Sequence, residues 1–254
     1  MIKPEELKVK IFADGADKAG MLEMYRNPLI KGFTTNPTLM RKADITDYRV
    51  FALDILSEIQ DRPISFEVFA DEFQEMERQA LEISHWGRNV FVKIPVTNTR
   101  REPSDSLIRR LSGNGVKLNV TALMTLDQVH SIAPCLANGP EAYISLFAGR
   151  VADTGVDPIP LMSEAVQYLR KYPNIELIWA SPRELLNIYH AEIAGCQVIT
   201  VTNDVLKKLH LIGRDLKEYS LDTVKMFYED GRKAGYVLED GKKTKVAGAT
   251  ASVP

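Results

Sequence analysis

The chain of 254 residues is 45% hydrophobic and 26% charged, a composition that suits one large folded domain or two small ones. Its formal net charge of −2 leaves no excess of cations for a nucleic-acid backbone or an anionic membrane surface, so neither partner is expected. Neither a run of 18 apolar residues nor an apolar export segment is present, and we expect a cytoplasmic protein.

Short apolar runs alternate with longer amphipathic segments along most of the chain. The runs predicted to be strands are 8–14, 32–36, 64–69, 89–95, 116–123, 142–147, 175–181 and 196–201. The segments predicted to be helices are 16–26, 44–60, 71–85, 103–112, 125–137, 158–171, 183–194 and 203–211. This alternation over about 200 to 250 residues is typical of an α/β protein with a (β/α)₈ TIM barrel. An open doubly wound sheet is the alternative, but no glycine-rich phosphate fingerprint follows the first strand.

The domain organisation follows from this pattern. We predict a catalytic barrel over residues 1–212, an additional C-terminal helix over 213–237 that packs on the barrel or on a neighbouring subunit, and a flexible tail over 238–254. The two cysteines and four histidines do not have the spacing of metal ligands. No metal and no other cofactor is therefore expected.

One lysine, Lys93, stands inside the apolar run "NVFVKIP". Strand side chains alternate between two faces, so Lys93 shares a face with Phe91, while Val90, Val92 and Ile94 form a purely apolar face. The apolar face should meet the helices. Lys93 is therefore predicted to point into the barrel, near the C-terminal end of its strand.

Five other predicted strands carry a polar residue in their C-terminal half, on the face opposite to apolar or small residues. These residues are Asp14, Asn36, Glu67, Asn119 and Ser145. Barrel enzymes hold their active sites at the C-terminal ends of the strands. Convergence of polar side chains from six strands at this end predicts an active site there.

A lysine in this setting has a specific chemical use. Burial disfavours its ammonium form, and the neutral amine can attack a carbonyl group to form a Schiff base. Asp14 and Glu67 can move the protons that such chemistry requires, and the Thr121 hydroxyl can hold a relay water. The alternative is an ion pair between Lys93 and Asp14 or Glu67 that only holds strands together.

Other polar residues suit a phosphorylated sugar. Asn36 and Asn119 can donate hydrogen bonds to substrate hydroxyls. Arg150 and Arg183 stand just past strand ends, and Ser181 precedes Arg183 by two residues ahead of a predicted helix. Such an arrangement suits a phosphate monoester, although each arginine alone could equally form a surface ion pair.

Several segments resemble one known family. "GFTTNPTLM" resembles the TTNP signature of the transaldolase family, and "VFVKIPVT" is similar to the segment around its Schiff-base lysine. "NVTALMTLDQ", "ISLFAGRV" and "WASPRELLNIYHAEIAGCQVITV" resemble later blocks of the family in the same order. The resemblance covers roughly residues 8 to 211. It implies a metal-free class I aldolase on a (β/α)₈ barrel.

The resemblance also implies individual roles. Lys93 would form the imine, Asp14 would act as acid and base, and Glu67 and Thr121 would hold the relay water. The other implied residues bind the substrate or its phosphate: Asn36, Asn119, Ser145, Arg150, Ser181 and Arg183.

The family divides between transaldolases, which transfer a dihydroxyacetone unit to an aldose phosphate, and fructose 6-phosphate aldolases, which release it. The aldolases carry glutamine at the relay position and tyrosine at an aromatic position, where this chain has Glu67 and Phe147. The resemblance therefore predicts a transaldolase, a homo-oligomeric transferase of the pentose phosphate pathway that acts on sugar phosphates. The alternatives are aldolase-type release of dihydroxyacetone, a phosphosugar isomerase, and a barrel without catalytic activity.

Overall fold

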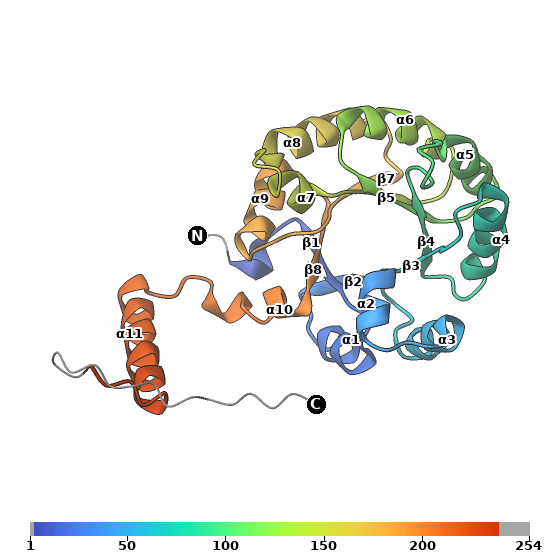
Figure 1. The fold of residues 1–254 in the computed structure, drawn as a ribbon. Helices are drawn as coiled ribbons and strands as arrows, with labels where there is room; N and C mark the ends of the chain where they lie inside the picture. The colour runs from blue at the N-terminus through green and yellow to red at the C-terminus, as the bar shows by residue number, and fades with distance from the viewer. Residues whose placement is uncertain (1–2, 239–254) are drawn as a thin grey trace. The chain divides into compact units, whose positions relative to one another are not determined.

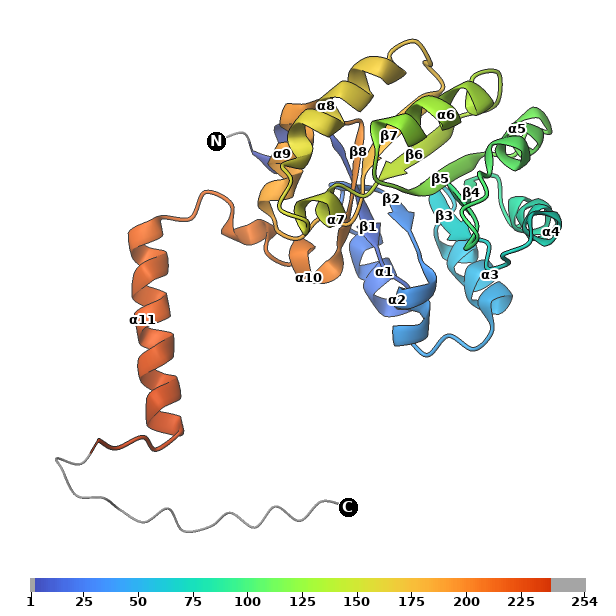
Figure 2. The same ribbon diagram turned by 45° about the horizontal axis from the view of Figure 1, so that its top comes forward.

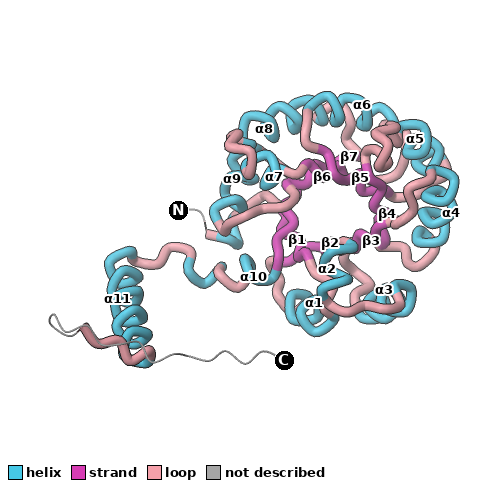
Figure 3. Tube along the Cα trace, viewed as in Figure 1, coloured by secondary structure: helices cyan, strands magenta, loops and turns pink. Residues whose placement is uncertain are grey.

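The computed structural model describes residues 3–238 and contains a closed barrel of parallel strands in the order β1-β2-β3-β4-β5-β6-β7-β8. The strands are β1 (Lys10–Asp14), β2 (Ile30–Thr34), β3 (Ile64–Glu67), β4 (Val90–Pro95), β5 (Leu118–Leu123), β6 (Ala142–Leu146), β7 (Ile175–Trp179) and β8 (Val198–Thr202). They form a ring with the helices around it (Figure 1; Figure 3, strands in magenta). The predicted (β/α)₈ barrel is confirmed.

Helices follow each strand and run along the outside of the barrel (Figure 2). They are α1 (Lys18–Tyr25), α2 (Pro37–Lys42), α3 (Tyr48–Glu58), α4 (Phe73–Ser84), α5 (Asp105–Gly113), α6 (Leu126–Leu136), α7 (Ala148–Ala152), α8 (Pro158–Leu169), α9 (Leu186–Ala194) and α10 (Asn203–Leu206). Short 3₁₀ turns occupy Pro4–Glu6 and Leu209–Leu211. None of the helices within residues 3–238 has the length and apolar character needed to cross a membrane.

The described part of the chain divides into two compact units, one that ends at His210 and one that begins at Leu211. The second unit contains helix α11 (Leu216–Lys233), which begins where Asp215 accepts hydrogen bonds from the backbone of Lys217 and Glu218. Packing of this helix on the barrel or on a neighbouring subunit stays a prediction. The predicted tail lies outside the described residues apart from its first position, residue 238.

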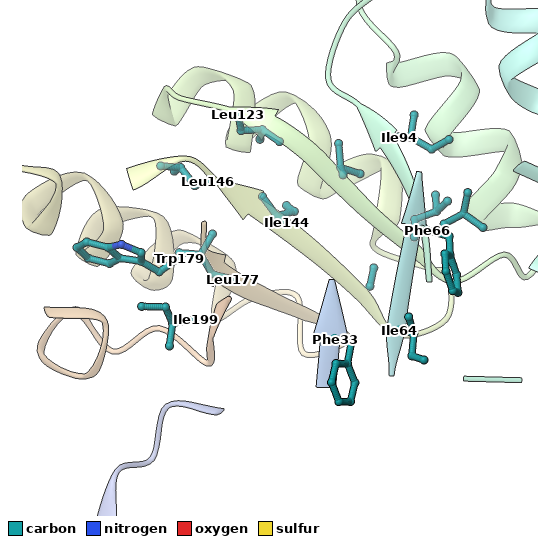
Figure 4. Packing of buried hydrophobic residues seen from close by; sticks show 14 of the residues in the cluster. Phe33, Ile64, Phe66, Ile94, Leu123, Ile144, Leu146, Leu177, Trp179 and Ile199 are labelled. Atoms are coloured by element: carbon teal, nitrogen blue, oxygen red, sulfur yellow. The ribbon is translucent and has the colours of Figure 1, made fainter. Parts of the chain in front are cut away.

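The alternation seen in the sequence separates two apolar layers. Outward-facing strand side chains form the large core between the sheet and the helices. Figure 4 shows this layer, with these residues labelled: Phe33, Ile64, Phe66, Ile94, Leu123, Ile144, Leu146, Leu177, Trp179 and Ile199. Because this layer is continuous around the barrel, every strand is held with its other face toward the barrel axis.

An aromatic cluster fills the interior of the barrel. Phe12 meets Tyr143 edge-on with ring centroids 5.6 Å apart, and Phe91 lies 4.5 Å from the same tyrosine ring. Gly32 faces this cluster, and a Cβ at that position would lie 2.6 Å from the Phe12 ring, so only glycine fits there without movement. These rings precede the polar residues by two positions along β1, β4 and β6, which leaves the C-terminal end for the polar side chains.

The observed strand β2 begins and ends two residues earlier than the predicted strand 32–36. The strand ends there because Asn36 caps helix α2: its Oδ1 accepts a hydrogen bond of 3.0 Å from the Leu39 N–H, and Pro37 occupies the first helical position. Helices α2 and α7 are both short and were not predicted. Their few residues give too little periodicity to be recognised in the sequence.

Candidate active site

A cavity of about 410 Å³ opens at the C-terminal ends of the strands. Ten of the eleven predicted site residues line it: Asp14, Asn36, Glu67, Lys93, Thr121, Ser145, Phe147, Arg150, Ser181 and Arg183. They come from strands β1, β3, β4, β5 and β6, from helix α7, and from the segments that directly follow β2, β6 and β7. The parity of the strands thus brings together groups that are far apart in the sequence.

Lys93 is the buried cation of this cavity, with only 6% of its surface exposed. Its Nζ lies 3.1 Å from Glu67 Oε2 and donates a hydrogen bond of 2.8 Å to the Thr35 backbone carbonyl. Glu67 and Lys93 are paired in register on adjacent strands, which places both side chains at the same level of the barrel. Of the two carboxylates considered from the sequence, Glu67 is the one in direct contact with the amine.

Asp14 occupies the neighbouring position at the end of β1. Its Oδ1 accepts a hydrogen bond of 2.8 Å from the Thr34 hydroxyl, and its Oδ2 accepts one of 3.3 Å from the Asn36 amide. Burial raises the pKa of Asp14 above its ordinary value of 3.8, although the charge of Lys93 and these two hydrogen bonds act in the opposite direction. A carboxyl group with a raised pKa is suited to exchange protons with a substrate.

A bulge near the end of β5 shapes the third side of the cavity. The pairing of β5 with β6 shifts between Val120 and Leu123, and Ala122 adopts a φ of 66°, which is unusual for a residue with a Cβ. Next to it, the buried Thr121 Oγ1 has no hydrogen-bonding partner among the described residues. Buried hydroxyls are seldom unpaired, so this one is available to a substrate hydroxyl or to water.

Asn119 is the predicted site residue that the structure does not place on the cavity wall. It is fully buried, its Nδ2 donates to Ser65 Oγ at 3.0 Å, and its Oδ1 accepts from Ser145 Oγ at 2.7 Å. Both ends of its amide are thus occupied by neighbouring side chains. Asn119 orients Ser145, which does line the cavity.

The arginines lie at the other side of the cavity and have different partners. The Arg150 guanidinium sits 5.4 Å from the centroid of the Phe147 ring and makes no ion pair within residues 3–238. Arg183 binds both oxygens of the Asp153 carboxylate, with 3.0 Å between Nε and Oδ1. The hydrogen bond from Arg183 lowers the pKa of Asp153, which keeps this carboxylate ionised.

Ser181 adopts a left-handed backbone conformation with a φ of 61°. Its carbonyl oxygen would lie 1.5 Å from a Cβ at position 149, so the loop can take this path only because residue 149 is glycine. Strained backbone of this kind is often found at functional sites. Here it brings the loop after β7 against the first turn of α7.

Sequence reasoning missed four threonines of the cavity wall, Thr34, Thr38, Thr200 and Thr202, and one aspartate beside it. Thr34 and Thr200 line the cavity, and their hydroxyls are 2.5 Å apart. Both face the barrel interior by the same parity rule that identified Lys93, so the signal was present. Asp153 follows the unpredicted helix α7, and the sequence has no local pattern that would assign it to Arg183.

No cluster of three or more His, Cys, Asp or Glu side chains within residues 3–238 is placed to hold a metal ion. The polar groups in the cavity are an amine, hydroxyls, an amide, guanidinium groups and two carboxylates. Such a set suits organic substrates with carbonyl, hydroxyl and phosphate groups.

The fold and the cavity define a (β/α)₈-barrel protein with a buried lysine–carboxylate pair at the C-terminal ends of the strands. A family model described as "Transaldolase/Fructose-6-phosphate aldolase" matches residues 11–247. A protein named "Probable transaldolase" from Dehalococcoides mccartyi is 33% identical over 202 residues, which cover 79% of this chain and 90% of that protein. Another protein of the same name, from Thermoanaerobacter sp., is 31% identical over 228 residues, which cover 89% of this chain and 99% of that protein.

The chain therefore belongs to the transaldolase/fructose-6-phosphate aldolase family, as the sequence motifs predicted.

Similar solved structures agree with the fold. Dihydrodipicolinate synthase from Rhodopseudomonas palustris superposes with a TM-score of 0.54 at 14% identity, covering 87% of this chain and 80% of that one. Tryptophan synthase subunit alpha from Campylobacter jejuni gives a TM-score of 0.54 at 12% identity, and the match covers 81% of this chain and 90% of that one. At these identities the likeness concerns the barrel fold alone.

Proposed function

We propose that this protein is a transaldolase that carries a dihydroxyacetone unit on Lys93 from a ketose phosphate to an aldose phosphate. The observation that supports this most strongly is the position of the Lys93 amine, buried in the cavity beside Glu67 and near the protonatable Asp14. An ion pair that only linked strands would not need an adjoining cavity lined by hydroxyls and arginines.

In the first step, the deprotonated Lys93 amine attacks the C2 carbonyl of the ketose phosphate and forms a carbinolamine. Loss of one water molecule then yields the imine. Glu67 lies 3.1 Å from Lys93 Nζ, so it can accept the proton of the ammonium group and return one to the departing hydroxyl. The free hydroxyl of Thr121 is suited to hold the water that relays these protons.

In the second step, the Asp14 carboxylate takes the proton of the C4 hydroxyl, the C3–C4 bond breaks, and an aldose phosphate leaves. The electron pair of the broken bond remains as an enamine on Lys93. An incoming aldose is attacked by this enamine while protonated Asp14 returns its proton to the new hydroxyl. Hydrolysis of the resulting imine releases the new ketose phosphate and restores the amine.

The substrate phosphate would bind at the side of the cavity that holds Arg150, Ser181 and Arg183. Of these two arginines, Arg150 is the one that makes no close ion pair in the described part of the chain, which makes it the more available to an anion. The length of the substrate then spans from these arginines to Lys93.

Transfer, rather than release, is favoured by two side chains. Glu67 has already returned its proton when the imine forms and so has none to give to the enamine, and Phe147 has no hydroxyl to position a hydrolytic water. Turnover of fructose 6-phosphate should therefore depend on an added aldose such as erythrose 4-phosphate. The pentose phosphate pathway, the homo-oligomeric state and the cytoplasmic location stay predictions from the sequence.

The test is reduction of the imine with borohydride in the presence of fructose 6-phosphate, followed by intact-protein mass measurement. We expect a sugar-derived mass on the wild type and none on Lys93→Met. Lys10→Met is the matched control, because Lys10 is also a strand lysine paired with a carboxylate, Glu176, at 2.5 Å, but it does not line this cavity.

The Lys10→Met variant should be labelled as well as the wild type. No added mass on the wild type, or equal labelling of Lys93→Met, would exclude the proposed mechanism and favour an isomerase that uses a carboxylate base. Rapid release of dihydroxyacetone that an aldose acceptor does not suppress would favour the aldolase alternative.

A further inference from the structure

Pairing between β2 and β3 stops just below the proposed catalytic residues. The Thr35 N–H still donates to the Ser65 carbonyl at 3.1 Å, and a regular parallel ladder would next join the Glu67 N–H to the Thr35 carbonyl. This bond is replaced by two others. The Thr35 carbonyl accepts from Lys93 Nζ at 2.8 Å, and the Glu67 N–H donates to the Tyr48 hydroxyl, also at 2.8 Å.

Tyr48 is the first residue of α3 and is well placed to hold the end of β3. The same hydroxyl that accepts from the Glu67 N–H donates to the Glu67 carbonyl at 3.1 Å. The Tyr48 ring lies edge-on to Phe66 and Phe69, and it also contacts Trp86, with centroids 4.6 to 6.0 Å away. Burial raises the pKa of Tyr48, so its hydroxyl stays protonated and can keep both hydrogen bonds.

We propose that Tyr48 is a positioning residue for the lysine–carboxylate pair. Its hydroxyl takes the place of the Thr35 carbonyl as the partner of the Glu67 N–H, which leaves that carbonyl free to bind Lys93. The contact of 3.1 Å between Glu67 and Lys93 depends on this exchange of partners. The inference rests on the proposed function, because it assumes that this contact serves catalysis.

Replacement of Tyr48 by phenylalanine would keep the ring packing and remove only the hydroxyl. The Glu67 N–H and carbonyl would then lose their partner in a buried setting, which is unfavourable. In a regular ladder the acceptor for this N–H would be the Thr35 carbonyl. Closure of the ladder would make Glu67 compete with Lys93 for this oxygen and would move both groups.

The experiment compares steady-state transfer by the wild type and by Tyr48→Phe. We expect kcat to fall about tenfold to hundredfold, since small displacements of reacting groups have effects of this size. The KM for fructose 6-phosphate should stay within about twofold, because the arginines lie on other elements. The matched control is Tyr25→Phe, which removes a tyrosine hydroxyl that donates to Asp61 at 2.8 Å outside the cavity and should leave kcat unchanged.

A double-mutant cycle separates positioning from a general loss of structure. If Tyr48 acts through Glu67, the loss in kcat of Tyr48→Phe combined with Glu67→Gln is smaller than the product of the two separate losses. The rate of borohydride trapping on Lys93 should fall in Tyr48→Phe together with kcat.

Two results would overturn the inference: a kcat for Tyr48→Phe within twofold of the wild type, or losses that multiply fully in the double variant. Failure of the proposed function is recognised separately, because then the wild type itself gives no trapped adduct on Lys93. A wild type that is trapped and transfers normally, with an unaffected Tyr48→Phe variant, rejects the positioning role alone.

Discussion

The two arginines of the cavity should differ in their contribution to phosphate binding. Arg150 makes no close ion pair within residues 3–238 and acts on Asp153 only through its charge, whereas Arg183 is held by both oxygens of Asp153. A phosphate that binds Arg183 must replace or share this carboxylate. We therefore predict that Arg150→Ala raises the KM for phosphorylated substrates more than Arg183→Ala does.

The expected sizes follow from the type of contact. Loss of a charge-assisted partner of a bound phosphate costs about 2 kcal/mol at the low end, which is about 30-fold in KM for Arg150→Ala. The Arg183–Asp153 pair is half-exposed, with 49% and 51% of the side chains accessible, and such surface pairs contribute little. Arg183→Ala should therefore raise KM only about threefold to tenfold, and Asp153→Asn should lower it about twofold to fivefold.

The assay measures KM with glyceraldehyde 3-phosphate and with unphosphorylated glyceraldehyde as acceptors, at low and at high salt. Only the KM for the phosphorylated acceptor should change, and the lowering of this KM by Asp153→Asn should become smaller with added salt. Glu184→Gln is the control for net charge, because Glu184 neighbours Arg183 but its carboxylate makes no ion pair in the described chain. Equal effects on both acceptors, or a raised KM in Asp153→Asn, would refute this account of the phosphate site.

Three further predictions concern single features of the cavity. Because burial raises the pKa of Asp14, the stability it contributes is fully present below its unfolded pKa and is lost as the pH rises through its folded pKa. In urea unfolding, the free energy of unfolding of Asp14→Asn should thus rise relative to that of the wild type as the pH increases above the ordinary carboxyl value of 3.8, and a difference that does not change with pH would contradict this. Phe147→Tyr combined with Glu67→Gln should increase the release of free dihydroxyacetone in the absence of an acceptor, as measured by coupling to glycerol dehydrogenase. An unchanged rate of release would show that these two residues do not favour transfer over release. Gly149→Ala would place a Cβ 1.5 Å from the Ser181 carbonyl oxygen. This variant should therefore lower the free energy of unfolding by about 1–3 kcal/mol and raise the KM for phosphorylated substrates. An unchanged free energy of unfolding would show that the loop can move freely.

The sequence by itself determined the barrel and most of the cavity wall. The alternation of apolar and polar residues along a strand is a local property, and it was sufficient to orient Lys93 inward and its apolar neighbours toward the helices. The same rule, applied strand by strand, predicted Asp14, Glu67 and Ser145 at the C-terminal end. The motif resemblance then indicated the family, which the comparisons confirmed.

The tertiary structure decided which of these groups touch. The register between β3 and β4 paired Lys93 with Glu67 rather than with Asp14, and hydrogen bonds to two neighbours kept Asn119 below the cavity. The bond between Arg183 and Asp153 likewise joins two loops that are 30 residues apart. A strand's own pattern fixes the face on which a side chain lies, but the register and the loop paths arise from packing between distant segments. For this reason the sequence could predict the set of residues in the cavity, and only the fold could assign their partners.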